Sequence, residues 1–229
     1  MTTGPLEVLC TLGLAGAMAE LRPRLEQAAG LPLSIRFGPA AELSLDIERG
    51  AAFDVAVLTD AVIDAQTTNG HIVVGSRVDI AGSCVGATVP PGADIPDIST
   101  VEAFRRTVLA AEFVIFTTRG ASGQHFASLL PRLGIEEEVR RKAVIGEGLI
   151  ATRVVTGEIE LGIQQVSEIL AVPGAVLVGP IPTELQKYTV FSAGLGSNAK
   201  DTAAANALIA LLTRPSTIDL LIAKGMERV

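Results

Sequence analysis

Short apolar runs alternate with segments of helical period along the first third of the chain. Residues 6–12, 33–37 and 53–59 are mostly apolar, and turn residues separate them from the helical segments, which predicts strands. Between the first two, residues 13–29 repeat apolar side chains at spacings of three and four, and Gly30 stands where such a helix would end. This β-α-β-α-β-α order is typical of a parallel sheet with right-handed crossovers.

The middle of the chain carries a strand, a loop of small residues and a helix in immediate succession. Residues 113–116 are apolar, residues 119–123 are mostly small, and apolar side chains then recur at helical spacing up to Gly134. A helix N-terminus has unpaired N–H groups and a partial positive charge, which together bind anions. Here Ser122 can cap the helix or donate to a ligand, and Arg119 can grip a carboxylate. The alternative is an ordinary strand-to-helix turn with a serine cap.

Extended runs interrupt the α/β alternation near Ile80 and near Tyr188. The chain could pass there between two α/β units, which predicts a two-lobed fold. Lobe I would contain residues 1–80 plus 190–229, and lobe II residues 81–189. Because ligands of open α/β sheets bind at the carboxyl ends of the strands, we expect a ligand cleft between the lobes.

Composition and charge narrow the possible partners. The 229 residues are 48% apolar, with 23 Gly and 12 Pro, as in a globular chain with a substantial core and many turns. The absence of Trp and the single Tyr disfavour stacking on nucleic-acid bases. The net charge of −7 disfavours both nucleic acid and anionic membrane surfaces. We therefore expect no nucleic-acid partner and no membrane insertion.

Cysteine and histidine are too few and too scattered for a metal site. Cys10 and Cys84 lie in apolar runs, and His71 and His125 are the only histidines. No metal-ligand spacing connects these residues, so we predict buried thiols, no metal and no cofactor.

The N-terminal apolar segment resembles an export signal only in part. Residues 6–19 end in a plausible cleavage sequence, but no Lys or Arg precedes them and Glu7 lies where positive charge is expected. The same segment also fits a first strand and helix. We predict a cytoplasmic protein, or a periplasmic one if a signal was removed before Met1.

Four stretches together resemble one known family. They are VLCTLGLAGAMAEL near the start, PAAELSLDIERGAAFDVAVLTDAVID, RGASGQHFASLLPRLG and LGIQQVSEIL. They resemble type II periplasmic binding proteins, in the branch that is like molybdate-binding proteins. The resemblance implies a two-lobed α/β fold in which each lobe has a mixed, mostly parallel sheet flanked by helices. It also implies a small anion held between the lobes by backbone N–H groups and hydroxyls.

The resemblance points to ligand-binding positions in four loops and one late strand, with the third-loop donor on Ser122 and the fourth on or near Gly148. The family's first-loop serine corresponds to Gly13, and its serine-rich second loop corresponds to residues 39–41, which carry no hydroxyl. The family's late-strand tyrosine corresponds to Gln165. With the candidates from residue chemistry added, the predicted ligand-binding residues are Thr11, Gly13, Ala40, Ala41, Arg119, Ser122, Gly148 and Gln165.

The missing hydroxyls favour an organic carboxylate over molybdate, because each unpaired oxygen of a buried oxyanion would cost about 1–3 kcal/mol. The leading hypothesis is a solute-binding protein for a small anion, either a di- or tricarboxylate or an oxyanion. It would be a monomer, and the lack of a recognisable signal weakens a link to an ABC transporter. The alternative is an isomerase of unsaturated tricarboxylates, since some relatives in this branch resemble aconitate isomerase. Such an enzyme needs a base, for which His125 and Glu147 are the candidates.

Overall fold

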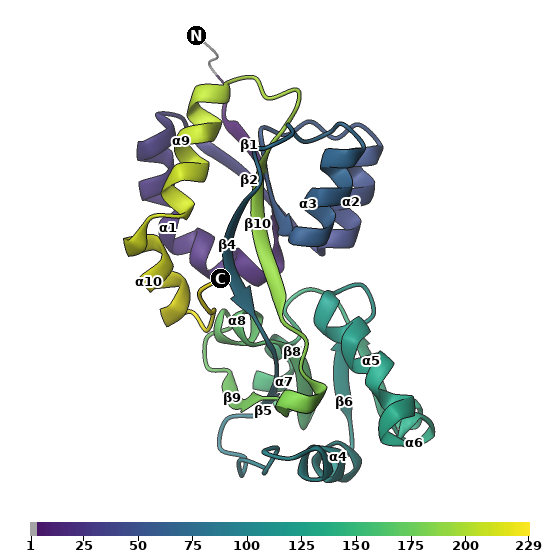
Figure 1. Cartoon of the computed structure of the whole chain (residues 1–229). Coiled ribbons are helices and arrows are strands. Elements are labelled where there is room, and N and C mark those ends of the chain that lie inside the picture. The colour runs from purple at the N-terminus through teal and green to yellow at the C-terminus, as the bar shows by residue number, and fades with distance from the viewer. Residues whose placement is uncertain (1–3) are drawn as a thin grey trace. The chain divides into compact units, whose positions relative to one another are not determined.

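The computed structural model describes residues 4–229 and divides the chain into two compact units. Unit 1 combines Met1–Gly82, as far as it is described, with Thr189–Val229, and unit 2 is Ser83–Tyr188. The chain therefore passes from one unit to the other twice, after Gly82 and after Tyr188. Both units are built from one sheet with helices packed on its faces (Figure 1).

Unit 1 contains a five-stranded sheet in the order β2-β1-β3-β10-β4. Strand β1 pairs in parallel with β2 and β3, whereas β10 runs antiparallel to β3. The strands are β1 (Leu6–Thr11), β2 (Leu33–Gly38), β3 (Val55–Thr59), β4 (Val78–Ser83) and β10 (Thr189–Leu195).

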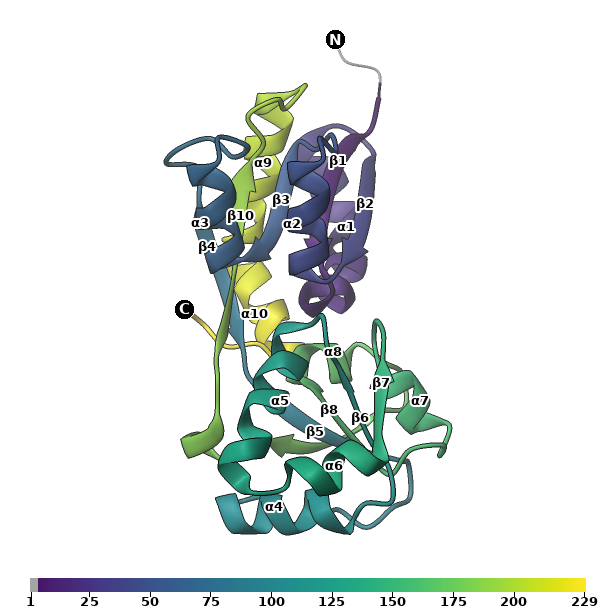
Figure 2. The ribbon, with the colours of Figure 1, turned by 90° about the vertical axis from the view of Figure 1, so that its right-hand side faces the viewer.

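Helices cover both faces of the sheet of unit 1 (Figures 1 and 2). One face carries α1 (Ala15–Ala29), α9 (Thr202–Leu212) and α10 (Pro215–Ala223), whose apolar side chains share a core with β1, β3 and β10. The other face carries α2 (Ala40–Glu48) and α3 (Asp60–Thr68), which form a second apolar cluster. A single 3-10 turn, η1, joins β1 to α1.

Unit 2 also contains a five-stranded sheet, in the order β7-β6-β8-β5-β9. Strand β6 pairs in parallel with β7 and β8, and β5 runs antiparallel to β8 and β9. The strands are β5 (Val85–Val89), β6 (Val114–Thr117), β7 (Ala143–Gly146), β8 (Leu161–Gln165) and β9 (Val176–Pro180).

The larger core of unit 2 lies under its longest helices. The helices are α4 (Val101–Ala110), α5 (Ala121–Leu133), α6 (Glu136–Lys142), α7 (Ala151–Val155) and α8 (Val166–Leu170), with a 3-10 turn η2 at Thr183–Leu185. Phe126 of α5 packs edge-on against Phe104 and Phe116, with ring centroids 6.2 and 5.1 Å away. These aromatic contacts join α4 and α5 to β6. A smaller cluster packs Val154 of α7 against Ile115 of β6.

Local interactions set the starts of three helices. The capping side chain of α4 is Thr100, whose hydroxyl accepts from the N–H of Ala103 at 3.1 Å. Asp60 is the first residue of α3, and its carboxylate accepts from the next N–H at 2.8 Å. Helix α7 begins at Ala151, after Gly148, whose φ of 65° an α-helix does not allow.

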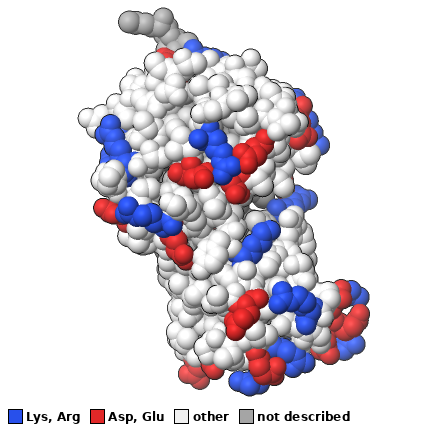
Figure 3. Space-filling view, in the orientation of Figure 1, with Lys and Arg blue, Asp and Glu red and all other residues white. Residues whose placement is uncertain are grey.

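Helix α6 lies on the surface and carries its charges in ion pairs. Arg140 lies 2.9 Å from Glu136 and 3.1 Å from Glu137, and Figure 3 shows both signs of charge intermixed over this helix.

Among residues 4–229 no single helix is long and apolar enough to span a membrane, although α9 and α10 pass that test as a pair bent by 59°. In the same range no three His, Cys, Asp or Glu side chains gather in a way that would hold a metal ion.

Candidate functional site

Three parallel strands of unit 2 end side by side. Thr117 of β6 is paired in register with Gly146 of β7, and β6 also neighbours β8, which ends at Gln165. The loops that follow these strands therefore start at one edge of the sheet, which we call the strand-end edge of unit 2. In open α/β sheets this is the edge where ligands bind.

The first turn of α5 brings free backbone donors to this edge. Gln124 is the first residue of the turn whose N–H is hydrogen-bonded, at 3.0 Å from the carbonyl of Gly120. The N–H groups of Ala121, Ser122 and Gly123 have no acceptor within the described residues 4–229. Since α5 is 13 residues long, its dipole adds positive potential at these amides. The turn is therefore suited to hold an anion.

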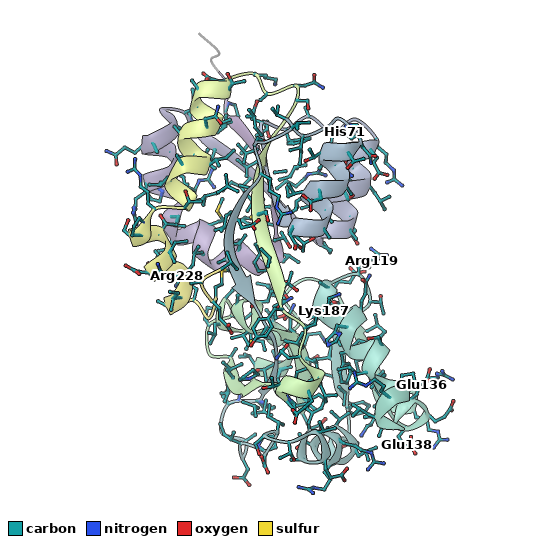
Figure 4. All side chains as sticks on the ribbon, in the orientation of Figure 1. His71, Arg119, Glu136, Glu138, Lys187 and Arg228 are labelled. Carbon is teal, nitrogen blue, oxygen red and sulfur yellow. The ribbon has the colours of Figure 1, made fainter. Side chains whose placement is uncertain are left out.

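The predicted residues Ser122 and Arg119 both belong to this turn. Ser122 is the second residue of α5 and only 2% exposed, and the cap position is held by Gly120, so the predicted serine cap is wrong. Arg119 lies in the loop between β6 and α5, at the N-terminal end of the helix (Figure 4). Arg119 is exposed and precedes the first free amide by two residues, so it brings a positive charge to the same loop.

Small residues in this loop are required by how closely α5 approaches β6. A Cβ atom on Gly123 would lie 1.8 Å from the carbonyl oxygen of Thr117. The N–H of Gly120 donates to the hydroxyl of Thr117 at 3.2 Å. The small residues thus let α5 begin directly against the end of β6. This close approach keeps the free amides of α5 at the strand-end edge.

The end of β8 adds buried polar groups to the same edge. Gln164 is 1% exposed, and its side-chain NH₂ donates to the carbonyl of Gly148 at 2.8 Å, which ties β8 to the loop after β7. The Gln164 Oε1 and Ser167 Oγ atoms are buried without a partner in the described part of the chain. Unpaired buried polar atoms cost about 1–3 kcal/mol each, so native proteins usually pair them with protein, water or ligand. These atoms are therefore available to a ligand or water at the strand-end edge.

Glu168 also lies here, and the sequence analysis did not include it. It is half-buried in the first turn of α8 and accepts hydrogen bonds from the backbone N–H of Gln165 and the side chain of Gln164. Burial raises the pKa of the Glu168 carboxyl to about 7, against the opposing effect of the two hydrogen bonds. The only sequence signal was a glutamate three residues after a strand end, which is also the spacing of an ordinary helix cap.

Unit 1 has a strand-end edge of its own, formed by β1, β2 and β3. Thr11 and Thr59 stand at the ends of neighbouring strands, and neither hydroxyl caps the helix that follows. At the start of α2, Pro39 accepts from the N–H groups of Glu42 and Leu43, whereas those of Ala40 and Ala41 have no acceptor within residues 4–229. This edge offers hydroxyls at positions 11 and 59 and two backbone donors.

Gly13 has no room for a side chain. A Cβ atom at this position would lie 2.4 Å from the ring of Phe191, which is itself buried in β10. The hydroxyl that the family resemblance implies for the first loop is therefore excluded by packing, unless Phe191 moves. Gly13 is buried, and only its backbone could serve a ligand.

The two predicted bases have different surroundings. The Nε2 atom of His125 is 2.6 Å from the carbonyl oxygen of Leu185, and because a carbonyl only accepts, this nitrogen carries the proton. His125 thus faces η2. Glu147 is exposed in the loop between β7 and α7, next to Gly148.

Of the predicted residues in unit 2, the structure gathers Arg119, Ser122, Gly148 and Gln165 at the strand-end edge.

Comparison with known proteins gives consistent results along nearly the whole chain. A family model described as bacterial extracellular solute-binding protein matches residues 6–227. An aconitate isomerase from Pseudomonas sp. is 32% identical over 231 residues, which cover 98% of this chain and 88% of that protein. The molybdate-binding protein ModA of Azotobacter vinelandii is 25% identical over 96% of this chain and 88% of its own length.

Solved structures show the same fold. The periplasmic molybdate-binding protein of Azotobacter vinelandii superimposes with a TM-score of 0.82 at 16% identity, over 98% of this chain and 99% of that one. The predicted two-lobed α/β fold of the type II periplasmic binding proteins is thereby confirmed.

Proposed function

The chain belongs to the bacterial extracellular solute-binding protein family, and from this we propose that it binds a small organic anion with two or three carboxylates. The observation that carries the proposal is the start of α5, where three free amides lie beside Arg119 and a buried Ser122. Backbone N–H groups and a guanidinium fork bind the two oxygens of a planar carboxylate well.

The composition of the strand-end edges favours carboxylates over tetrahedral oxyanions. Four buried oxygens need donors on all sides, and hydroxyls are the usual source of the additional ones. In unit 1 hydroxyls stand at positions 11 and 59, whereas a side chain at position 13 is excluded by Phe191 and Ala40 and Ala41 contribute amides only. The strand-end edge of unit 2 adds the unpaired hydroxyl of Ser167 and the unpaired amide oxygen of Gln164. An amide oxygen accepts hydrogen bonds, so Gln164 Oε1 suits a ligand hydroxyl or a bound water and not an anionic oxygen.

Thermal unfolding with a panel of anions tests the ligand class. Citrate or aconitate should stabilise the protein more than molybdate or tungstate. At about 100 times its Kd, a ligand should add about 2.7 kcal/mol of stability. For a chain of this size that corresponds to a rise in Tm of roughly 5–10 °C. A larger rise with molybdate than with any carboxylate would contradict the proposal.

Arg119 should contribute directly to carboxylate binding. Arg119→Ala should raise the Kd for the best carboxylate by roughly 10–100-fold, the value of a charge-assisted hydrogen bond, with little change in Tm. Isothermal titration calorimetry measures this. Arg141→Ala, on the exposed surface of α6, is the matched control and should leave the Kd within about twofold. An unchanged Kd for Arg119→Ala would show that this side chain does not touch the ligand.

A second function, isomerisation of an unsaturated tricarboxylate, is favoured by two observations. The aconitate isomerase relative is 32% identical over 98% of this chain, against 25% over 96% for the molybdate-binding protein. The strand-end edge of unit 2 also holds a carboxyl whose pKa lies near neutrality, at about 7. Moving a C=C bond beside a carboxylate requires a group that removes and returns a proton, and such a pKa suits that task.

The cellular location and the partners of the chain stay predictions. The family description names extracellular proteins, whereas the sequence predicts a cytoplasmic location. Fractionation of cells that express the natural gene, with a blot for this protein, distinguishes the two. The monomeric state and any ABC transporter partner likewise remain to be measured.

A further inference from the structure

We infer that Glu168 is the acid–base residue of the strand-end edge of unit 2, the group that takes a proton from a bound unsaturated tricarboxylate and returns it. The inference rests on the proposed isomerase function and deepens it by naming the residue. Glu168 lies in the first turn of α8, immediately after the end of β8.

The surroundings of Glu168 favour a role with a ligand. Its carboxylate accepts from the N–H of Gln165 and from the Gln164 side chain, so two donors fix its position. Within the four residues that precede it in the sequence, Gln164 Oε1 and Ser167 Oγ are buried and have no partner in residues 4–229. The Ser167 hydroxyl has a proton to donate to a ligand carboxylate, and Gln164 Oε1 can accept one from a hydroxyl or water. These unpaired atoms independently indicate a ligand beside Glu168.

Burial gives Glu168 the protonation behaviour that the role requires. A carboxyl with a pKa of about 7 is present in both forms at neutral pH, so it can accept a proton and give it back. An exposed glutamate is almost fully ionised there and is a weaker base.

The other candidates that follow β6, β7 and β8 are less suited. His125, on the helix after β6, donates its Nε2 proton to the carbonyl oxygen of Leu185. Glu147, after β7, is exposed to solvent. Glu168, by contrast, directly follows Ser167 and accepts from the side chain of Gln164, and these are the two residues that carry the unpaired buried atoms.

The proton transfer conserves atoms and electrons without a co-reactant. The Glu168 carboxylate removes a proton from the methylene carbon beside one substrate carboxylate. The C–H electron pair forms the new C=C bond to the adjacent carbon, and the electron pair of the old C=C bond takes the proton back at its far carbon. The same carboxyl returns that proton, so the protein ends in its starting state. The negative charge that builds up on the substrate in between is stabilised by N–H groups and cations such as those at the start of α5.

Glu168 could instead serve only as a helix cap, because its bond to the N–H of Gln165 is the reciprocal half of a capping box. A capping role predicts a loss of stability and no specific loss of proton transfer. Glu168→Gln keeps the shape of the side chain and much of its capping ability but removes the proton-carrying group. It therefore separates the two roles.

The test follows solvent deuterium exchange and isomer formation in cis- and trans-aconitate by proton NMR, with Kd from calorimetry and Tm for each variant. Glu168→Gln should slow both processes at least about 100-fold, with Kd within about threefold of the wild-type value. Glu168→Asp, which keeps the carboxyl but withdraws it, should recover part of the rate. Glu158→Gln is the matched control, since Glu158 is exposed and pairs with Arg153 at 3.4 Å on the same unit, and its rate should stay within about twofold.

Each failure has a different meaning. If Glu168→Gln exchanges protons within about threefold of wild type, Glu168 is not the acid–base residue, while the isomerase function stands. If the wild-type protein binds aconitate but neither exchanges nor isomerises it, the isomerase function and the role of Glu168 are both overturned, and carboxylate binding stands. If neither isomer binds, the proposed tricarboxylate ligand is itself wrong for this site.

Discussion

Gly123→Ala should lower the free energy of unfolding by about 3 kcal/mol or more, the high end of the range for overpacked sites. The added methyl group would lie 1.8 Å from the carbonyl oxygen of Thr117, 2.7 Å from its carbonyl carbon and 2.8 Å from its nitrogen. All three are backbone atoms of β6 and cannot swing aside as a side chain would. Either α5 or the end of β6 must move, and both are fixed by the core around Phe126 and Phe116. Urea unfolding followed by circular dichroism measures the change.

Gly38→Ala is the matched control for this prediction. Gly38 also joins a strand to a helix, but a Cβ atom there meets only the side chain of Leu43, at an ordinary contact distance of 3.4 Å. Its effect on stability should stay within about 1 kcal/mol. The variant at position 123 should also weaken carboxylate binding, because any shift of α5 displaces its free amides. Wild-type stability for Gly123→Ala would mean that α5 does not approach β6 as closely as described.

As the pH rises from about 5 to about 7.5, the free energy of unfolding of the wild-type protein should fall relative to that of the Glu168→Gln variant. The pKa of Glu168 is raised from 4.5 to about 7 in the folded state. Between these values the folded state binds more protons than the unfolded state, so stability decreases with rising pH. Each pKa unit corresponds to about 1.4 kcal/mol, and the expected difference over the whole window is about 2–3 kcal/mol.

Urea unfolding of both proteins at pH 5, 6, 7 and 8 measures this effect. The glutamine variant has no proton to lose at this position, so subtracting its pH profile removes the contribution of every other titrating group that the substitution leaves unchanged. Parallel profiles for the two proteins would show that the carboxyl is solvated. The measurement is independent of turnover, so it tests the environment of Glu168 even if no substrate is found.

The order of strands and helices was predictable because each element follows from the spacing of apolar residues within its own segment. Apolar runs of strand length and apolar spacings of helical period correspond to β1, α1, β6 and α5 in the structure. Gly30 and Gly134 have φ values of 70° and 63° at the ends of two helices, where glycine alone has no Cβ to hinder this conformation. The family resemblance, which uses longer stretches of sequence, predicted the two-lobed fold correctly.

Strand direction and side-chain partners depended on residues far apart in the chain. Strand β10 enters the sheet of unit 1 antiparallel to β3, although its own apolar run would fit either direction. Gly13 is small because the ring of Phe191 fills the space beside it. The Nε2 of His125 donates to the carbonyl oxygen of Leu185, and the sequence around neither residue predicts this contact.

What the sequence determined by itself, then, is the set of strands and helices and the presence of a donor-rich turn at residues 119–123, since these follow from local periodicity and residue size. The tertiary structure decided which groups meet at the strand ends. Gln164 reaches Gly148 because β7 and β8 flank β6 in one sheet, and Glu168 is half-buried because α8 packs against β5, β8 and β9. The burial that brings the pKa of Glu168 close to neutrality is a property of that packing, and a pattern of residue types along the chain does not contain it.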